Sequence, residues 1–201
     1  MSEVLSGLAA FFALSTVAFG TQNALFGRSL GITRLITLTE ESLDGVLRFC
    51  LTLTVVQTAS APLCWLANRY LQPFAFRTAV RPLVFLLITL FIARHIRILL
   101  RRFAPHKGDK IADVITPASI NGCVLGTLLV CVSQNYLLWQ YCAFSLGSGL
   151  GYLLAVLVVS EGQRKLNRRE IPVSFRGMPV MMIYIGILSL AIYGLTGHML
   201  A

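Results

Sequence analysis

The sequence VITPASINGCVLGTLLVCVSQNYLLWQYCAFSLGSGLGYLLAVLVVS, residues 114–160, contains no Asp, Glu, Lys or Arg. A transmembrane helix needs about 20 consecutive, predominantly apolar residues to cross the hydrocarbon of a bilayer. This stretch is long enough for two crossings, and the polar residues Ser133, Gln134 and Asn135 near its middle predict a turn between them. The stretch therefore predicts a hairpin of two membrane-spanning helices.

Four further spans are predicted on either side of this hairpin. Residues 4–27, 49–68 and 177–201 also contain no Asp, Glu, Lys or Arg. The uncharged run 82–93 is shorter and has arginines on both flanks, but long arginine side chains can reach the interface from near a helix end. We therefore count residues 75–100 as a span and predict an all-α membrane protein with six transmembrane helices.

The composition also indicates that the protein folds in lipid rather than in water. The 201 residues are 56% hydrophobic and 12% charged, and the mean hydropathy is +0.76. A water-soluble domain carries roughly 25% charged residues, so this chain has too few polar groups to cover a surface in water. Disorder requires low hydrophobicity, and five cysteines are too sparse for a disulfide scaffold. Lipid is the remaining medium.

The basic residues are distributed unevenly between the two sides that six spans create. Three of the 17 Lys and Arg residues fall on the side of the chain ends and the loops near 69–77 and 133–136, and 14 fall on the other side. Because cytoplasmic loops carry the excess of Lys and Arg, both termini are predicted to be non-cytoplasmic. The net charge of +9 thus reflects topology. Basic residues scattered over short loops, without a reading motif, argue against nucleic-acid binding.

Three spans followed by three spans would form two inverted repeats, about residues 1–105 and 106–201, as in many membrane proteins that move ions. The first span of each half contains an asparagine beside small residues, which predicts interrupted first and fourth helices. The residues are Gly20, Asn23 and Gly27 in the first half and Asn121, Gly122 and Gly126 in the second. At such breaks half-helix ends can face an ion or cofactor, which makes these residues candidates for a central pathway. Alternatively, the two asparagines hydrogen-bond a neighbouring helix.

Several segments resemble the A-type membrane protein of the Rnf electron-transport complex, which is closely related to the E-type protein of the sodium-pumping NADH:quinone reductase. They are residues 22–32, the glycine-rich run 147–151, the segment 172–177 (Pro-Val-Ser-Phe-Arg-Gly) and residues 194–197. The resemblance covers nearly the whole chain. It implies a six-helix inverted-repeat fold in the bacterial inner membrane, with both termini on the non-cytoplasmic side.

The resemblance also implies a function. Members are membrane-embedded subunits of a pump that couples electron transfer between ferredoxin and NAD to sodium or proton movement. Partners would be other Rnf or Nqr subunits, especially an inverted sister subunit of E or D type, which would share a [2Fe–2S] cluster with this chain through two cysteines each. Flavins and catalysis would belong to partner subunits, because this chain has no nucleotide motif, catalytic triad or membrane-buried carboxylate. The alternatives are a free-standing inverted-repeat transporter and a cluster-less structural subunit.

This chain departs from the family pattern at the cysteine positions. Where the family has cysteine directly after Leu-Gly-Ile, this chain has Thr33, whose hydroxyl is a poor, hard ligand. At the second position, counting from the preceding proline makes Cys123 the ligand. The register set by Asn121 and Gly126 puts Gly122 there instead. Cys123 is therefore either a [2Fe–2S] ligand or a small buried apolar residue.

The other four cysteines do not supply the missing pair. Cys50 and Cys64 lie in the second predicted span, where a small apolar residue explains them. Cys131 and Cys142 flank the predicted turn at similar depth. A disulfide between these two stays an open alternative, which requires that their helix faces agree.

Overall fold

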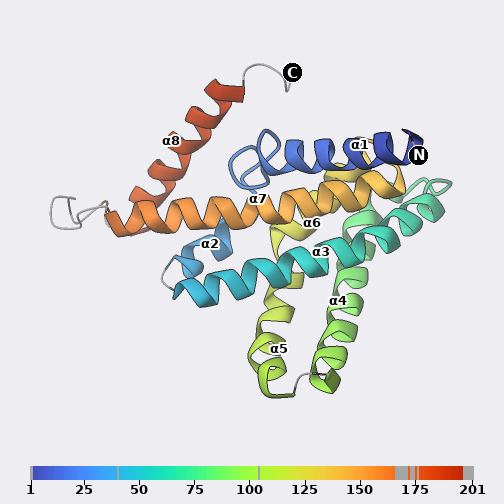
Figure 1. Ribbon diagram of the computed structural model, residues 1–201, viewed down its shortest axis with the longest axis horizontal. Helices are drawn as coiled ribbons and strands as arrows, with labels where there is room; N and C mark the ends of the chain where they lie inside the picture. Colours follow the sequence, from blue (N-terminus) through green and yellow to red (C-terminus); the bar gives the residue numbers. More distant parts are fainter. Residues whose placement is uncertain are drawn as a thin grey trace.

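The computed structural model describes residues 2–39, 41–103, 105–165, 172, 175 and 177–196. Within these residues it contains eight α-helices and no strand, which confirms the predicted all-α class (Figure 1). In chain order the helices are α1 (Ser2–Phe19), α2 (Ile32–Leu38), α3 (Leu43–Leu71), α4 (Arg77–Phe103), α5 (Pro105–Ser119), α6 (Gly122–Ser133), α7 (Leu138–Lys165) and α8 (Met178–Thr196).

Three of the described helices, α3, α4 and α7, are long and apolar enough to cross a membrane. The pair α5–α6 meets the same test over Ile111–Ser119 and Gly122–Ser133, although the chain bends by 46° between them. These four units coincide with the second to fifth predicted spans. The apolar parts of the terminal helices, Ser6–Phe19 and Met178–Gly194, are shorter. The described residues therefore give a multi-pass membrane protein with three or four clear spans.

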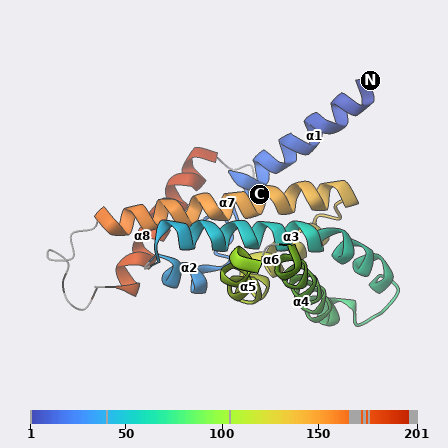
Figure 2. The ribbon, with the colours of Figure 1, turned by 60° about the horizontal axis from the view of Figure 1, so that its bottom comes forward.

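Helices α3 and α7 form the centre of the bundle and run antiparallel, side by side (Figures 1 and 2). The side chain of Gln57 on α3 is fully buried and donates from Nε2 to the carbonyl of Ser145 on α7 over 3.1 Å. Helix α1 runs beside α7 and rises away from it toward its own N-terminus (Figure 2). Helices α4 and α5 pack against each other and against α3, and α6 lies between α3 and α7.

The glycine-rich run of α7 allows its neighbours to approach closely. A Cβ on Gly147 would overlap backbone atoms of Ser15 on α1. One on Gly149 would lie 2.6 Å from the hydroxyl of Thr54 on α3, and one on Gly151 would lie 2.7 Å from the carbonyl oxygen of Phe19 on α1. Small residues at helix contacts are typical of membrane bundles, where close van der Waals packing replaces the hydrophobic effect between helices.

The chain is interrupted at both predicted places. Helix α1 ends at Phe19, and residues 20–31 form turns before α2 begins, so this break is longer than the sequence indicated. The second break is short and consists of Ile120 and Asn121 between α5 and α6. The predicted polar turn is also present, because α6 ends at Ser133 and α7 begins at Leu138.

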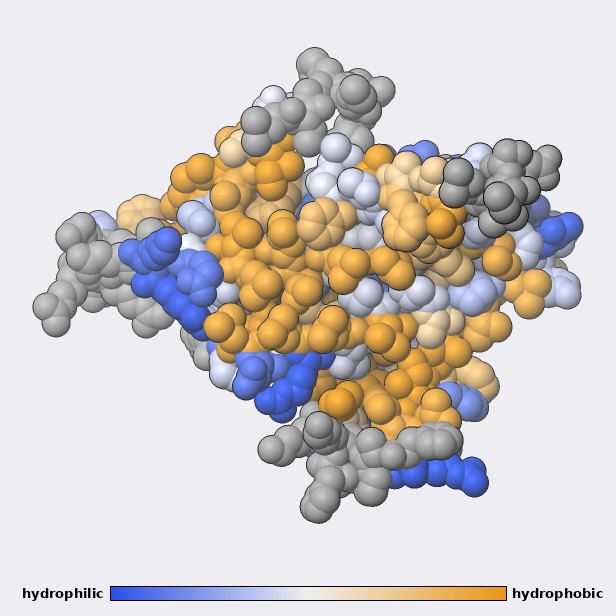
Figure 3. Space-filling model, in the orientation of Figure 1, coloured by the Kyte–Doolittle hydropathy of each residue, from blue (hydrophilic) through white to orange (hydrophobic). Residues whose placement is uncertain are grey.

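The face of the molecule seen in Figure 3 is mostly apolar, and its most hydrophilic residues lie toward the edges. On α4, Leu83, Leu87 and Phe91 are each more than half exposed, as expected for a face that contacts lipid or another membrane protein. The end of α3 and the turn before α7 line one shared pocket through Arg69 and Tyr136, among others. The structure thus brings together two loops that the charge pattern predicts on the same side of the membrane.

Candidate functional site

The two breaks touch each other at the centre of the bundle. A Cβ on Gly31, at the end of the first break, would lie 2.8 Å from Oδ1 of Asn121 and 3.2 Å from Cβ of Cys123. A Cβ on Gly122 would lie 3.5 Å from the backbone nitrogen of Gly31. Interruptions almost a hundred residues apart in sequence therefore meet at one junction.

Asn23 holds the first break in shape and ties it to α7. Its Oδ1 accepts hydrogen bonds from the backbone N–H of Leu25 at 3.0 Å and of Phe26 at 3.3 Å. Its Nδ2 donates to the carbonyls of Phe19 at 3.0 Å and Gly151 at 2.9 Å. The side chain is 2% exposed, and these four bonds use the whole capacity of an amide group. This geometry favours the interpretation in which Asn23 bonds a neighbouring helix.

Asn121 caps the helix that follows the second break. It has an extended backbone conformation, with φ −66° and ψ 137°, and its Oδ1 accepts from the N–H of Cys123 over 2.8 Å. This is the usual geometry of an N-cap, which satisfies one of the free N–H groups at a helix start. The Asn121 amide lies beside α7, since a Cβ on Gly31 would be 2.8 Å from both Oδ1 of Asn121 and the ring of Tyr152.

Tyr152 ties the end of the first break to α7. Its hydroxyl donates to the carbonyl oxygen of Gly31 over 3.0 Å, and Gly31 has a left-handed backbone with φ 78°. A side chain there is unfavourable on conformational grounds and has no room between Asn121 and Tyr152. Neither Tyr152 nor Gly31 was predicted from the sequence to be a site residue. Tyr152 could have been found in the sequence as a phenol within an apolar run, because a buried hydroxyl needs a hydrogen-bond partner.

A cavity of about 590 Å³ opens beside the junction and is shared by both halves of the chain. Its lining is Gly31, Thr33, Arg34 and Thr37 from the first half and Pro117, Ile120, Asn121 and Gly122 from the second. The start of α6 also lies at this cavity, and helix N-termini carry partial positive charge.

The charged side chain in this lining is Arg34. Its guanidinium pairs with Glu41 at 3.3 Å and lies 5.2 Å from the ring centroid of Phe49. Around it, the cavity offers hydroxyls and an amide. The lining as a whole consists of hydroxyl, amide, guanidinium and apolar groups together with glycine backbone.

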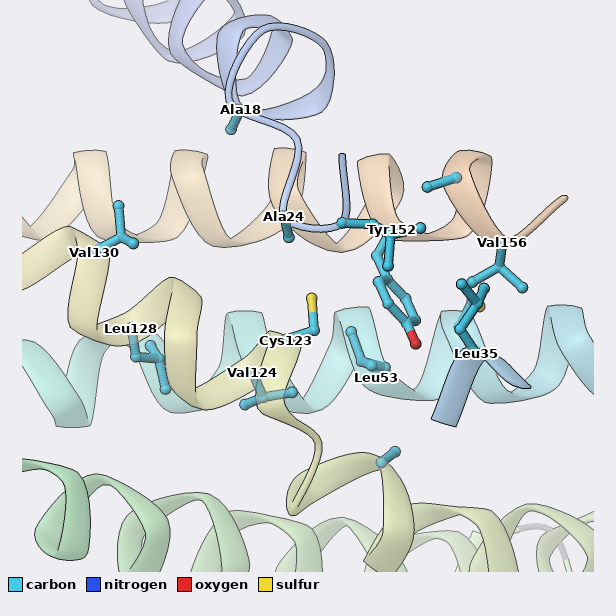
Figure 4. Packing of buried hydrophobic residues seen from close by; sticks show 14 of the residues in the cluster. Ala18, Ala24, Leu35, Leu53, Cys123, Val124, Leu128, Val130, Tyr152 and Val156 are labelled. Carbon is cyan, nitrogen blue, oxygen red and sulfur yellow. The ribbon is translucent and has the colours of Figure 1, made fainter. Parts of the chain in front are cut away.

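Cys123 faces away from this cavity. Its side chain has 0% exposure, whereas the preceding residue, Gly122, is exposed and lines the cavity. Figure 4 shows the Cys123 sulfur pointing toward α7, in the packed core that contains Ala24 and Tyr152. The buried hydroxyls of Thr127 on α6 and Ser148 on α7 are 2.8 Å apart across the same interface.

The remaining candidate pathway residues lie elsewhere. Gly20 and Asn23 line a small, mostly apolar cavity of about 220 Å³ toward α8, and Gly27 lines an adjoining one of about 360 Å³. Gly126 packs against the side chain of Leu30. The six candidate pathway residues therefore do not line one common cavity. Of the six, only Asn121 and Gly122 line the cavity at the junction.

All five cysteines are free thiols, including Cys131 and Cys142. Among the residues that the structure describes, no three His, Cys, Asp or Glu side chains come together in an arrangement that could hold a metal ion. Half of the Pro-Val-Ser-Phe-Arg-Gly segment, 172–177, lies outside the described residues, namely positions 173, 174 and 176.

Comparison with known proteins gives one consistent family. The family described as Rnf-Nqr subunit, membrane protein, matches residues 11–199. Among the relatives, the A-type protein of the ion-translocating oxidoreductase complex of Aromatoleum aromaticum is 30% identical over 158 residues, which cover 78% of this chain and 81% of the relative. The proteins of the same name from Shewanella amazonensis and Cereibacter sphaeroides are 26% and 24% identical, over 77% and 93% of this chain and 81% and 96% of their own lengths.

Proposed function

The chain belongs to the Rnf-Nqr family of membrane subunits, and on this premise we propose that it is the A-type component of an ion-translocating oxidoreductase complex. The observation that carries the proposal is the family match over residues 11–199, which includes both breaks and every candidate span. In this proposal the protein works with partner subunits of a complex that passes electrons across the membrane, and it helps couple this transfer to movement of sodium ions or protons.

The proposed fold is six transmembrane helices in two inverted three-helix repeats, residues 1–105 and 106–201. In this arrangement α1, the first break and α2 correspond to α5, the second break and α6, while α3 and α4 correspond to α7 and α8. The antiparallel packing of α3 and α7 and the contact between Gly31 and Gly122 support it. A repeat related by an axis in the membrane plane places equivalent elements antiparallel and brings their breaks to the midplane.

The proposed location is the bacterial inner membrane, with both termini on the non-cytoplasmic side. The uneven distribution of basic residues supports this orientation. Partners are the other subunits of the complex, in particular an inverted sister subunit of E or D type, and the bilayer itself. The exposed apolar side chains of α4, such as Leu83 and Phe91, are available for such contacts.

Within the complex, the residues of this chain act by position rather than by catalysis. Asn23 and Asn121 satisfy the backbone groups that the two breaks leave free, which is a requirement in hydrocarbon. Gly31 and Gly122 let the two breaks meet, and Tyr152 holds the first break against α7. The junction and its cavity are the central pathway of the protein in this proposal.

Co-purification tests the assignment. An affinity-tagged chain, extracted from the membranes of its host with a mild detergent, is expected to elute with the other subunits of an ion-translocating oxidoreductase complex. Deleting the chain should abolish ion uptake driven by electron transfer in membrane vesicles, and the wild-type chain should restore it. Isolation of the chain without partners, together with solute transport in liposomes, would contradict the proposal and favour the free-standing transporter.

Labelling tests the orientation. The single variants Gln72→Cys and Lys165→Cys place exposed thiols at opposite ends of the α3–α7 pair. A membrane-impermeant maleimide should label the cysteine at 72 from the non-cytoplasmic side and the cysteine at 165 only from the cytoplasmic side. Labelling of both from the same side would refute the proposed topology.

A further inference from the structure

The family resemblance implies a [2Fe–2S] cluster that takes one cysteine from each interrupted helix of this chain. The first of these positions is Thr33. The second is Gly122 or Cys123, depending on the register of the alignment. Iron–sulfur clusters are held by thiolates, so the register decides whether this chain offers one thiolate to the site or none.

The directions in which Gly122 and Cys123 face distinguish the two registers of the alignment. Thr33 and Gly122 are both exposed, and both line the cavity at the junction of the breaks. Cys123 is one residue further along α6, which turns its side chain by about 100°. It is fully buried and points into the core toward α7. The position that shares a cavity with Thr33 is therefore that of Gly122, and the register set by Asn121 and Gly126 is the one that fits.

The groups in this cavity do not suit an iron–sulfur cluster. Glycine has no side chain, and a threonine hydroxyl is a hard ligand that would have to lose a proton to imitate a thiolate. The remaining side chains of the lining are hydroxyl, amide, guanidinium and apolar groups. Cys50, in the same core cluster as Cys123, is also fully buried, so both thiols face the packed core of this chain rather than a surface shared with a partner protein.

We infer that this chain supplies no ligand to an iron–sulfur cluster, and that the cavity between Thr33 and Gly122 occupies the place where the family pattern puts the cluster cysteines. Cys123 is a packing residue of the interface between α6 and α7. This inference rests on the proposed function, because a cluster shared between subunits exists only in an assembled complex. It assigns the electron route through the complex to other subunits.

Metal analysis of the purified complex tests the inference directly. Iron and acid-labile sulfide per complex, and the EPR spectrum of the reduced complex, are expected to be the same in the wild type and in Cys123→Ala. Size-exclusion chromatography establishes that both assemble equally. Loss of a [2Fe–2S] signal in an assembled Cys123→Ala complex would overturn the inference. Failure of the wild-type chain to assemble with partners would instead overturn the proposed function.

Cross-linking of the chain itself tests the geometry and does not depend on the partners. The variant Thr33→Cys/Gly122→Cys, made in a Cys123→Ala background, places two thiols on the cavity. The new side chain at 122 has room, since its Cβ would lie no closer than 3.5 Å to any other residue beyond its chain neighbours. A short bis-methanethiosulfonate reagent should bridge the two thiols, detected as a single linker mass on the intact protein.

Two controls make the cross-linking decisive. The variant Thr33→Cys, which retains the native Cys123, should not be bridged, because the second thiol faces the core. The variant Thr33→Cys/Gly186→Cys in the Cys123→Ala background should not be bridged either, because Gly186 lies in open surroundings on α8. Bridging of Cys123 to the cysteine at 33, without bridging of the pair at 33 and 122, would refute the assigned register.

Discussion

Replacing Gly147 by alanine should push α1 away from α7. The added Cβ would overlap backbone atoms of Ser15, which cannot turn aside as the end of a flexible side chain can. The same contact carries a hydrogen bond of 2.9 Å from the Ser15 hydroxyl to the carbonyl of Ala143, and Ser15 is 9% exposed. A single methyl group therefore disturbs both the packing and the hydrogen bonding of this pair of helices.

The expected loss of stability is the balance of three terms. Overpacking of a tight contact costs about 1–3 kcal/mol. A hydrogen bond between membrane helices contributes about 0.6 kcal/mol on average and at most about 1.7. Alanine returns up to about 1 kcal/mol through its better helix propensity. The net loss is about 1–4 kcal/mol, which for a chain of this size lowers the melting temperature by roughly 2–15 °C.

Thermal unfolding in detergent with a thiol-reactive fluorophore measures this loss. Unfolding exposes four cysteines that are fully buried in the native state, namely Cys50, Cys64, Cys123 and Cys131. The matched control is Gly186→Ala, also in a helix, where an added Cβ meets no atom within 4 Å. The control should melt at or slightly above the wild-type temperature, because helix propensity is then the main remaining term.

A melting temperature of Gly147→Ala equal to those of the wild type and the control would contradict the predicted loss of stability. A melting temperature as low for Ser15→Ala as for Gly147→Ala would also contradict it. Removing the hydroxyl alone eliminates the hydrogen bond but leaves the close packing of the two backbones in place.

Three further predictions concern polar contacts. Asn23→Leu removes four hydrogen bonds and leaves buried backbone groups unpaired, at a cost of about 1–3 kcal/mol for each group. The variant should therefore be less stable by several kcal/mol and fail to assemble on size-exclusion chromatography. An assembled, normally stable variant would disprove the structural role of Asn23. Tyr152→Phe removes the bond to Gly31 and should lower the free energy of unfolding by about 0.5–1.5 kcal/mol, measured in the same thermal assay, and an unchanged stability would show that the hydroxyl does not hold the breaks. Arg97→Gln should change stability by less than about 1 kcal/mol, because its 3.7 Å ion pair with Asp113 is solvent-accessible; a larger loss would contradict that assessment.

The sequence alone predicted the features that depend on local composition. Lipid as the solvent followed from long runs without charge, and the turn before α7 followed from the polar residues at 133–135. The two interruptions were located correctly by Asn23 and Asn121, because an amide beside small residues in an apolar run both weakens a helix and can satisfy the backbone groups that the break frees.

The sequence could not determine which residues face one another. Whether Gly122 or Cys123 lines the cavity depends on how α6 is rotated about its axis, and a shift of one residue changes that direction by about 100°. The rotation is fixed by contacts with distant parts of the chain, such as Gly31 and Ser148. Apolar composition carries little information on this point, because lipid and core select the same kinds of side chain.

The solvent, the α-helical class and the sites of the breaks were thus determined by the sequence, since each follows from the transfer of a single segment into hydrocarbon. The meeting of the two breaks, the partner of Asn23 on α7 and the direction of the Cys123 thiol were decided by the tertiary structure. These depend on close packing between helices that are far apart in the chain, and such packing has no signature within any one helix.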